Sequence, residues 1–350
     1  MRSTIGRSWW ALIAALFTAP AMAPVCGDTV SKEARASAEL GLGWLLRAQN
    51  NDGSWGREPG AKGEVGNTSV ATLCLMAHGS TPTRGPHCTA VRRGFDWLAR
   101  RTQHFNEQSS LDRGTLLQTK LGVNADLYFV TLLYAQSLAL GLDKHEDEVR
   151  QRELSAMVRT IAGLQKENGE WETSYEPMLT TICAWLALKQ ASGAGIAIEA
   201  ASPRKAVRYL LEDCLERESG VFREAKWGRA ERFVTQAGAV RVLHGEGLGA
   251  RKEVQRAAAV IADMKFDQDV GGRTGGEEFL GALFATQALF IERDEHYAKW
   301  YPVITNGLQR SQNRDGSWQG HHCITDRVFC TACSVMTLLV PDKLVPMSER

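Results

Sequence analysis

The sequence predicts an all-α protein in which six helical hairpins close into an α/α toroid, with six inner and six outer helices. The spacing Gln-x3-Gly-x-Trp occurs three times in the 350-residue chain, at Gln49 to Trp55, Gln165 to Trp171 and Gln312 to Trp318. Each copy lies between two apolar helical patterns, so the repeating unit is helix, turn, helix. The second helix of each pair is the more apolar. A helix that is apolar on all sides is buried by its neighbours, whereas an amphipathic helix faces water.

The residue types in this spacing explain a tight corner between two helices. Gly53, Gly169 and Gly316 can take the positive φ that ends a helix. Asp52 and Asp315 can bond to backbone groups within the turn. The glutamine amide can reach backbone that the turn leaves unpaired, and the tryptophan can fold back over the helix it follows. We therefore interpret the motif as structural, with direct ligand contact as the lesser alternative.

Alignment on the turns gives six units, three with the full motif and three in which it is worn. The fourth unit keeps Gly220-Val221-Phe222 and the fifth keeps Gly271-Gly272-Arg273, while the second carries a longer loop at 108–122. Six units with short connections favour a closed ring. An open solenoid and a bundle are the alternatives.

The first 23 residues have the pattern of a secretory signal. Arg2 and Arg7 form the charged start, an apolar stretch follows, and cleavage is expected after Ala21 or Ala23. The apolar stretch is too short to span a bilayer. We therefore expect an exported protein, periplasmic or secreted, with no transmembrane segment.

Residues 24–37 are expected to lead into one toroid domain of residues 38–341, with a tail at 342–350. The formal charge is +1 and charged residues make up 23% of the chain. With a net charge this close to zero, the chain has no strong electrostatic field that would favour nucleic-acid binding. A small apolar ligand or a protein partner is compatible with this composition.

Gln-x3-Gly-x-Trp followed by an apolar helix resembles the repeat of the prenyltransferase and squalene-cyclase superfamily, over about residues 35–341. The resemblance implies the toroid fold and says less about activity. Cyclases of this group use an Asp-x-Asp-Asp motif, which this chain lacks. Its nearest match, Asp267-Gln268-Asp269-Val270, has no third carboxylate.

Prenyltransferase β subunits of the same superfamily bind zinc through Asp, Cys and His. In the matching run Cys330 stands where His is expected, and the preceding unit offers Glu277-Glu278-Phe279 in place of Asp-x-Cys. The zinc set that the resemblance implies is therefore not carried over. Whether the chain is an enzyme stays open at this point.

A local cluster of zinc-type ligands nevertheless occurs within 321–333. Its metal candidates are His322, Cys323, Asp326 and Cys330. Their spacing matches no standard zinc finger, and in an oxidising compartment a disulfide at Cys323 is the favoured alternative. The sequence requires no cofactor, although zinc or calcium could be held.

One position at the start of each second helix is acidic or amide-bearing. The six residues are Asn67, Asp126, Glu176, Glu231, Glu277 and Asp326. In a closed ring these positions lie at one level and encircle one mouth. Capping of each residue's own helix is the favoured explanation. The alternative is a polar site in which crowded carboxyls raise one another's pKa, as a general acid requires, or hold Ca²⁺.

The catalytic candidates in that alternative are Asp126, Glu176, Glu277 and Asp326. The ligand-binding candidates are Asn67, Glu231, Tyr128, Trp185, Phe279 and Phe329. An open cavity lined by these aromatics favours ligand binding, and a filled one favours a structural interaction module.

A non-catalytic exported protein is expected first, holding an apolar or amphipathic ligand in the cavity or a partner at its mouth. An enzyme that uses the mouth carboxylates, either terpene-cyclase-like or acting on polysaccharide, comes second. The interaction module comes third.

Overall fold

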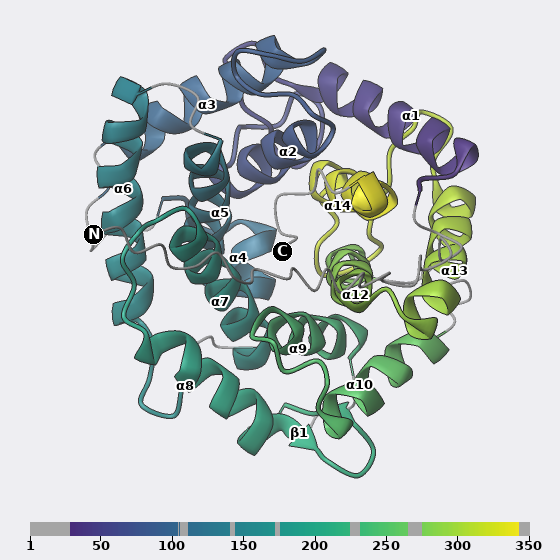
Figure 1. Ribbon diagram of the computed structural model, residues 1–350. Helices are drawn as coiled ribbons and strands as arrows, with labels where there is room; N and C mark the ends of the chain where they lie inside the picture. The colour runs from purple at the N-terminus through teal and green to yellow at the C-terminus, as the bar shows by residue number, and fades with distance from the viewer. Residues whose placement is uncertain are drawn as a thin grey trace, which may run out of the picture.

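The computed structural model describes residues 29–103, 105, 111–140, 144–171, 176–224, 232–264 and 275–342. The predicted signal segment, Glu231, the stretch 267–273 and the tail beyond Asp342 lie outside these residues. The fold is the predicted all-α toroid (Figure 1). Its inner helices are α2 (Val65–Ala77), α5 (Ala125–Ala139), α7 (Pro177–Gly193), α9 (Phe233–Gly245), α12 (Glu277–Glu292) and α14 (Arg327–Leu339).

An outer layer of helices surrounds them (Figure 1). Its helices are α1 (Lys32–Ala48), α3 (Cys88–Thr102), α6 (Lys144–Gly163), α8 (Ala201–Tyr209), α10 (Lys252–Asp263) and α13 (Glu295–Ser311). The shorter elements are α4 (Leu116–Leu121), η1 (Leu210–Cys214), β1 (Leu215–Glu216), β2 (Val221–Phe222) and η2 (Val340–Asp342). Helix α1 begins at Lys32, within the segment expected as a lead-in. None of the described helices is both long and apolar enough to cross a bilayer.

The ring is closed. Each inner helix packs on the next in the order α2, α5, α7, α9, α12 and α14, and α14 packs back on α2. Helix α1 packs on both α13 and α14, so the first and last hairpins are neighbours, as Figure 1 shows where the purple and yellow-green ends of the chain meet. The closure excludes the open solenoid.

Burial separates the two layers as the apolar patterns predict. Every residue of α2 is buried, whereas α3 and α10 each bury one face. Cys74, Cys183 and Cys333 are buried on inner helices, where they fill space as small apolar groups. All seven described cysteines are free thiols, so the disulfide expected at Cys323 is not formed. Its Sγ lies beside His322 and Lys120 instead of a second sulfur.

The three corners have the predicted chemistry. Gly53, Gly169 and Gly316 have φ of 96°, 98° and 96°, in the left-handed region that glycine tolerates. Trp55 is buried, and its indole Nε1 donates to the Leu45 carbonyl at 2.8 Å, on the helix just left. Trp171 and Trp318 make the same bond at 2.7 and 2.8 Å. The tryptophans therefore lock the corners.

The glutamines of the motif join each hairpin to the next. Gln49 Nε2 donates to the Gly53 carbonyl within its own turn at 3.0 Å and to the Ala90 carbonyl of α3 at 2.9 Å. Gln165 repeats the pattern onto α8. Gln312 repeats it onto Ser37 of α1 at 2.9 Å. The joint between the last and first hairpins is thus the same as the internal joints.

The worn fourth corner is rebuilt by a residue from the inner helix. Gln236 of α9 accepts from the Phe222 amide at 2.8 Å and donates to the Gly220 and Ala257 carbonyls at 2.9 and 3.2 Å. In the corners that keep the whole motif, two side chains make these bonds. The motif glutamine donates to the two carbonyl groups, and a threonine such as Thr68 accepts from the Trp55 amide. One side chain therefore replaces two.

Helix α4 fills the longer loop of the second unit and brings a cation to the ring. Thr115 begins it with a capping box, in which Thr115 Oγ1 accepts from the Gln118 amide and Gln118 Oε1 accepts from the Thr115 amide. The helix packs on α5 and α7. Lys120, in its last turn, is therefore buried beside the starts of the inner helices.

Candidate functional site at the mouth of the ring

The five described residues of the predicted acidic level all lie where an inner helix begins. They are Asn67, Asp126, Glu176, Glu277 and Asp326. Each is at most 2% exposed. The structure brings several of them together, and it does so through partners that come from other helices.

Capping does not explain these residues. None of the six inner helices is capped by a side-chain hydrogen bond from its own N-cap residue. By contrast Ser31 caps α1 and Asp294 caps α13 in the outer layer. The favoured explanation from sequence was therefore wrong, because the inner carboxylates turn across the mouth to partners on neighbouring helices.

The first group at the mouth, the Lys120 cluster, consists of Lys120, Glu176, Arg232 and Glu277. Lys120 Nζ lies 3.0 Å from Glu176 Oε1 and 3.0 Å from Glu277 Oε1, and all three side chains are at most 3% exposed. Arg232, at the start of α9, pairs with Glu176 as well. Burial acts to lower the pKa of Lys120, but the two carboxylates outweigh it and the pKa is raised. Two cations thus balance two carboxylates.

The second group, the Asn67 cluster, consists of Glu64, Asn67 and Asp326. Asn67 Nδ2 donates to Glu64 Oε2 at 2.8 Å and to Asp326 Oδ2 at 3.0 Å. Burial, and then the charge of Asp326, raise the pKa of Glu64 to about 7. Burial also raises the pKa of Asp326, although Asn67 and Arg57 oppose it. One neutral amide therefore holds two carboxyl groups close together.

Asp126 lies near this second group on α5. Neither carboxylate oxygen has a hydrogen-bond partner of normal geometry among the described residues, although the Gly66 amide approaches closely enough to lower the pKa somewhat. Burial first, then the charges of Asp112 and Glu64, raise the pKa of Asp126 to about 8. At neutral pH this carboxyl group therefore retains its proton.

The predicted metal candidates separate into two places. His322 and Cys323 lie together in the exposed loop before α14, with Glu277 beside them. Asp326 instead pairs with Asn67, and Cys330 is fully buried on α14. The cluster is thus smaller than the sequence predicted, and it includes a glutamate from the preceding unit.

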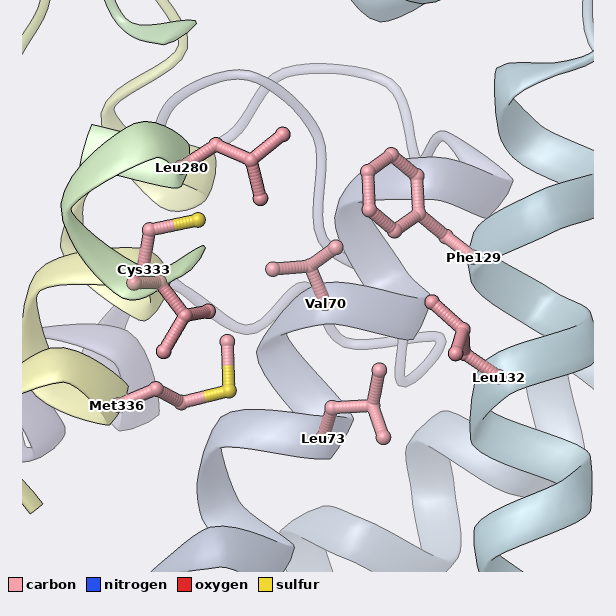
Figure 2. Close-up of a pocket in the computed structure, with 8 residues that line it drawn as sticks. Val70, Leu73, Phe129, Leu132, Leu280, Cys333 and Met336 are labelled. Atoms are coloured by element: carbon pink, nitrogen blue, oxygen red, sulfur yellow. The ribbon is translucent and has the colours of Figure 1, made fainter. Parts of the chain in front are cut away.

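The centre of the ring holds a small apolar cavity (Figure 2). It is lined from four inner helices by Val70, Leu73, Phe129, Leu132, Leu280, Leu283, Cys333 and Met336. Its volume is about 20 Å³, room for about one water molecule. The aromatic candidates Tyr128, Trp185, Phe279 and Phe329 do not line it and are at most 1% exposed, packed into the core.

Sequence reasoning missed Glu64, Lys120 and Arg232. Glu64 stands three residues before Asn67, a spacing that places both on one side of a helix start. Lys120 is the single charged residue of a short apolar helix, LLQTKL, and such a lysine needs a partner if it is buried. Only the closed ring identifies Glu277 as that partner.

No protein-family model matches the chain, and no curated protein sequence matches it. Solved structures do match it in fold. The GH76A α-1,6-mannanase of Salegentibacter sp. has a TM-score of 0.61 and 11% identity, over 89% of this chain and 99% of the mannanase. The type II terpene cyclase MstE from Scytonema has a TM-score of 0.56 and 14% identity, over 90% of this chain and 100% of the cyclase.

At these identities the likeness shows the fold alone. The α/α toroid fold that the sequence resemblance implied is confirmed. One mannanase structure is an inactive variant, with two adjacent aspartates replaced by asparagine, in complex with α-1,6-mannotriose. One cyclase structure holds its substrate, geranylgeranyl dihydroxybenzoate. Both neighbours of this α/α toroid are enzymes.

Proposed function

We propose that this protein is an enzyme that cleaves or transfers glycosidic bonds at the mouth of its helical ring, with Glu64 as the general acid. The observation that carries the proposal is the Asn67 cluster. Two hydrogen bonds from one amide nitrogen, at 2.8 and 3.0 Å, hold Glu64 and Asp326. Bonds of this length place the two carboxyl oxygens within about 6 Å of each other.

A pair of carboxyl groups is the usual equipment for glycoside hydrolysis. With a pKa of about 7, Glu64 carries a proton in a large share of molecules at neutral pH. Its side chain is 15% exposed, so substrate in the mouth can reach it. Glu64 gives its proton to the glycosidic oxygen as the C–O bond breaks, and ionised Asp326 forms a bond to the anomeric carbon. Water, which gives its proton back to Glu64, then cleaves that bond and releases the sugar. A separation this short is typical of retaining enzymes.

The size of the central cavity argues against a polyprenyl substrate. A cavity of about 20 Å³ lined by apolar side chains holds no terpene chain. The polar groups gather at the mouth instead, where the partly exposed Glu64 offers a hydrogen-bond partner to a substrate hydroxyl group. The mannanase neighbour, whose variant lacking two aspartates is inactive, supports the use of carboxyl groups on this fold.

A non-catalytic binding protein is the second candidate, and the burial of Asn67 and Asp326 favours it. Both are at most 1% exposed, so a ligand could rest on Glu64 without reaching the second carboxyl group. Such a protein binds saccharide and does not turn it over. Export of the mature chain remains a prediction in both cases, and it is tested by N-terminal sequencing of protein recovered outside the cytoplasm.

The test uses purified protein and a panel of aryl glycosides and linear oligosaccharides, α-1,6-linked mannan included. Glu64→Gln is expected to lower kcat/KM by about 10²- to 10⁴-fold, the contribution of a general acid. Glu58→Gln changes an exposed glutamate in the same loop and is expected to keep full activity. Saccharide binding without turnover in wild-type protein would leave the binding role, and equal activity of the two variants would refute the assignment of Glu64.

A further inference from the structure

We propose that Glu277 of the Lys120 cluster forms a zinc site with His322 and Cys323, and no part of the proposed glycosidase chemistry uses these three residues. One ligand atom from each residue, a carboxylate oxygen, an imidazole nitrogen and Sγ, lies within 4.8 Å of the other two. Zinc takes this mixture of oxygen, nitrogen and sulfur donors in tetrahedral sites. Three ligands leave a fourth position open, and His322 and Cys323 are exposed to solvent.

The backbone holds the two loop ligands in place. His322 forms a parallel bridge with Gly275, which stands two residues before Glu277 and so ties the loop before α14 to the start of α12. Cys323 follows with φ of 57°, a left-handed conformation that a non-glycine residue adopts at an energetic cost. In this conformation Cys323 Sγ lies 3.2 Å from His322 Nδ1. The strained residue thus brings sulfur and imidazole together.

Glu277 supplies the second, independent observation. The residue is 1% exposed, Oε1 is bound to Lys120, and Oε2 has no hydrogen-bond partner among the described residues. A Cβ at Gly275 would lie 2.1 Å from Oε2, so this oxygen lies against the bridge that carries His322. A buried carboxylate oxygen without a partner needs an explanation, and a bound cation at this place is one.

Lys120 then acts as a group that orients a ligand. Its Nζ lies 3.0 Å from Glu277 Oε1 and 3.8 Å from Cys323 Sγ, so it can keep Oε1 while Oε2 binds the ion. Binding requires the thiolate, so the Cys323 proton passes to solvent as the ion enters. The ion would lie beside the mouth, with its open position available to water or to a saccharide oxygen.

The experiment measures metal binding without substrate, so its outcome is independent of the proposed enzyme activity. The full chain, reduced and freed of metal with a chelator, is titrated with Zn²⁺ and with Co²⁺. We expect one ion per chain and, for Co²⁺, a thiolate-to-cobalt charge-transfer band. Cys323→Ser and His322→Ala should each weaken binding by more than about 100-fold, since loss of an orienting partner alone costs about 10- to 100-fold.

Matched controls come from the same chain. His321→Ala removes the neighbouring exposed histidine, and Cys88→Ser removes another partly exposed thiol. Both should bind zinc as the wild type does, and circular dichroism checks that all variants fold. The proposal is overturned if the reduced wild type binds no ion, or if Cys323→Ser and Cys88→Ser bind alike.

Discussion

The two polar clusters at the mouth are built from equivalent positions of the ring and have opposite electrostatic character. The Lys120 cluster sets two carboxylates against two cations, while the Asn67 cluster sets two carboxyl groups against one neutral amide. Both are buried. The Lys120 cluster joins α4, α7, α9 and α12, whereas the Asn67 cluster holds carboxyl groups with raised pKa. One level of the ring thus holds helices together on one side and, if the proposed function is correct, transfers a proton on the other.

Removal of the Lys120 ammonium group should have the largest effect on the free energy of unfolding. Lys120→Met leaves Glu176 and Glu277 buried with only Arg232 to balance them. Breaking a buried pair costs about 3–5 kcal/mol of unfolding free energy, measured by urea denaturation. Lys166→Met, which removes an i,i+4 pair from a side chain that is 35% exposed, should cost less than about 1 kcal/mol. Equal losses would contradict the distinction between a buried and a surface pair.

The Asn67 cluster should instead reveal itself in the pH dependence of activity. Glu64 acts as an acid only while protonated, so kcat/KM on a hydrolysed glycoside should fall as pH rises through about 7. In Glu64→Gln the residual activity should lose this limb of the profile. If the variant keeps the same limb, the titrating group is a different one.

Substitution of Asp126 should stabilise the folded chain, whereas Lys120→Met should destabilise it. Its pKa of about 8 in the folded chain lies above the ordinary value of 3.8, so the folded state holds the proton more tightly than the unfolded state. Stability therefore decreases as pH rises from about 4 to about 8. Asp126→Asn should remove this dependence and raise the free energy of unfolding near pH 8, by about 1.4 kcal/mol for each pH unit between the ordinary and the raised pKa.

The control for Asp126 is an exposed aspartate of the outer layer. Asp96→Asn should change stability by less than about 0.5 kcal/mol at every pH, as surface substitutions usually do. The measurement is a series of thermal or urea unfolding curves across pH. The prediction is contradicted if Asp96→Asn is stabilised, or if Asp126→Asn is destabilised near pH 8. Either result would mean that the loss of stability at high pH does not come from the Asp126 carboxyl group.

Local chemistry made the corners predictable from sequence. The spacing of Gln49, Gly53 and Trp55 specifies a turn whose bonds are made within a few residues or to the next helix. The six-unit count and the closed ring followed from repeating it. The fourth corner could not be predicted in detail, because Gln236 acts from the following helix.

The position of the polar residues at the mouth was predictable from sequence, but their hydrogen-bond and ion-pair partners were not. The acidic level is present, but helix capping is a local rule, and it failed where partners from distant segments compete for the carboxylates. Lys120 reaches Glu277 across more than a hundred residues of sequence, and Asn67 reaches Asp326 across more than two hundred. Such pairs exist only after the ring has closed.

The Gln312 joint has a consequence for the order of the chain. Because Gln312 bonds to Ser37 as Gln49 bonds to Ala90, the ring contains no special seam where its ends meet. Arg35 and Asp342, near the two ends of the described chain, lie 3.0 Å apart as an ion pair. A circularly permuted gene, with these ends linked and a new start between α7 and α8, therefore encodes the same glutamine joints. Which hairpin is synthesised first is a property of the gene and not of the ring.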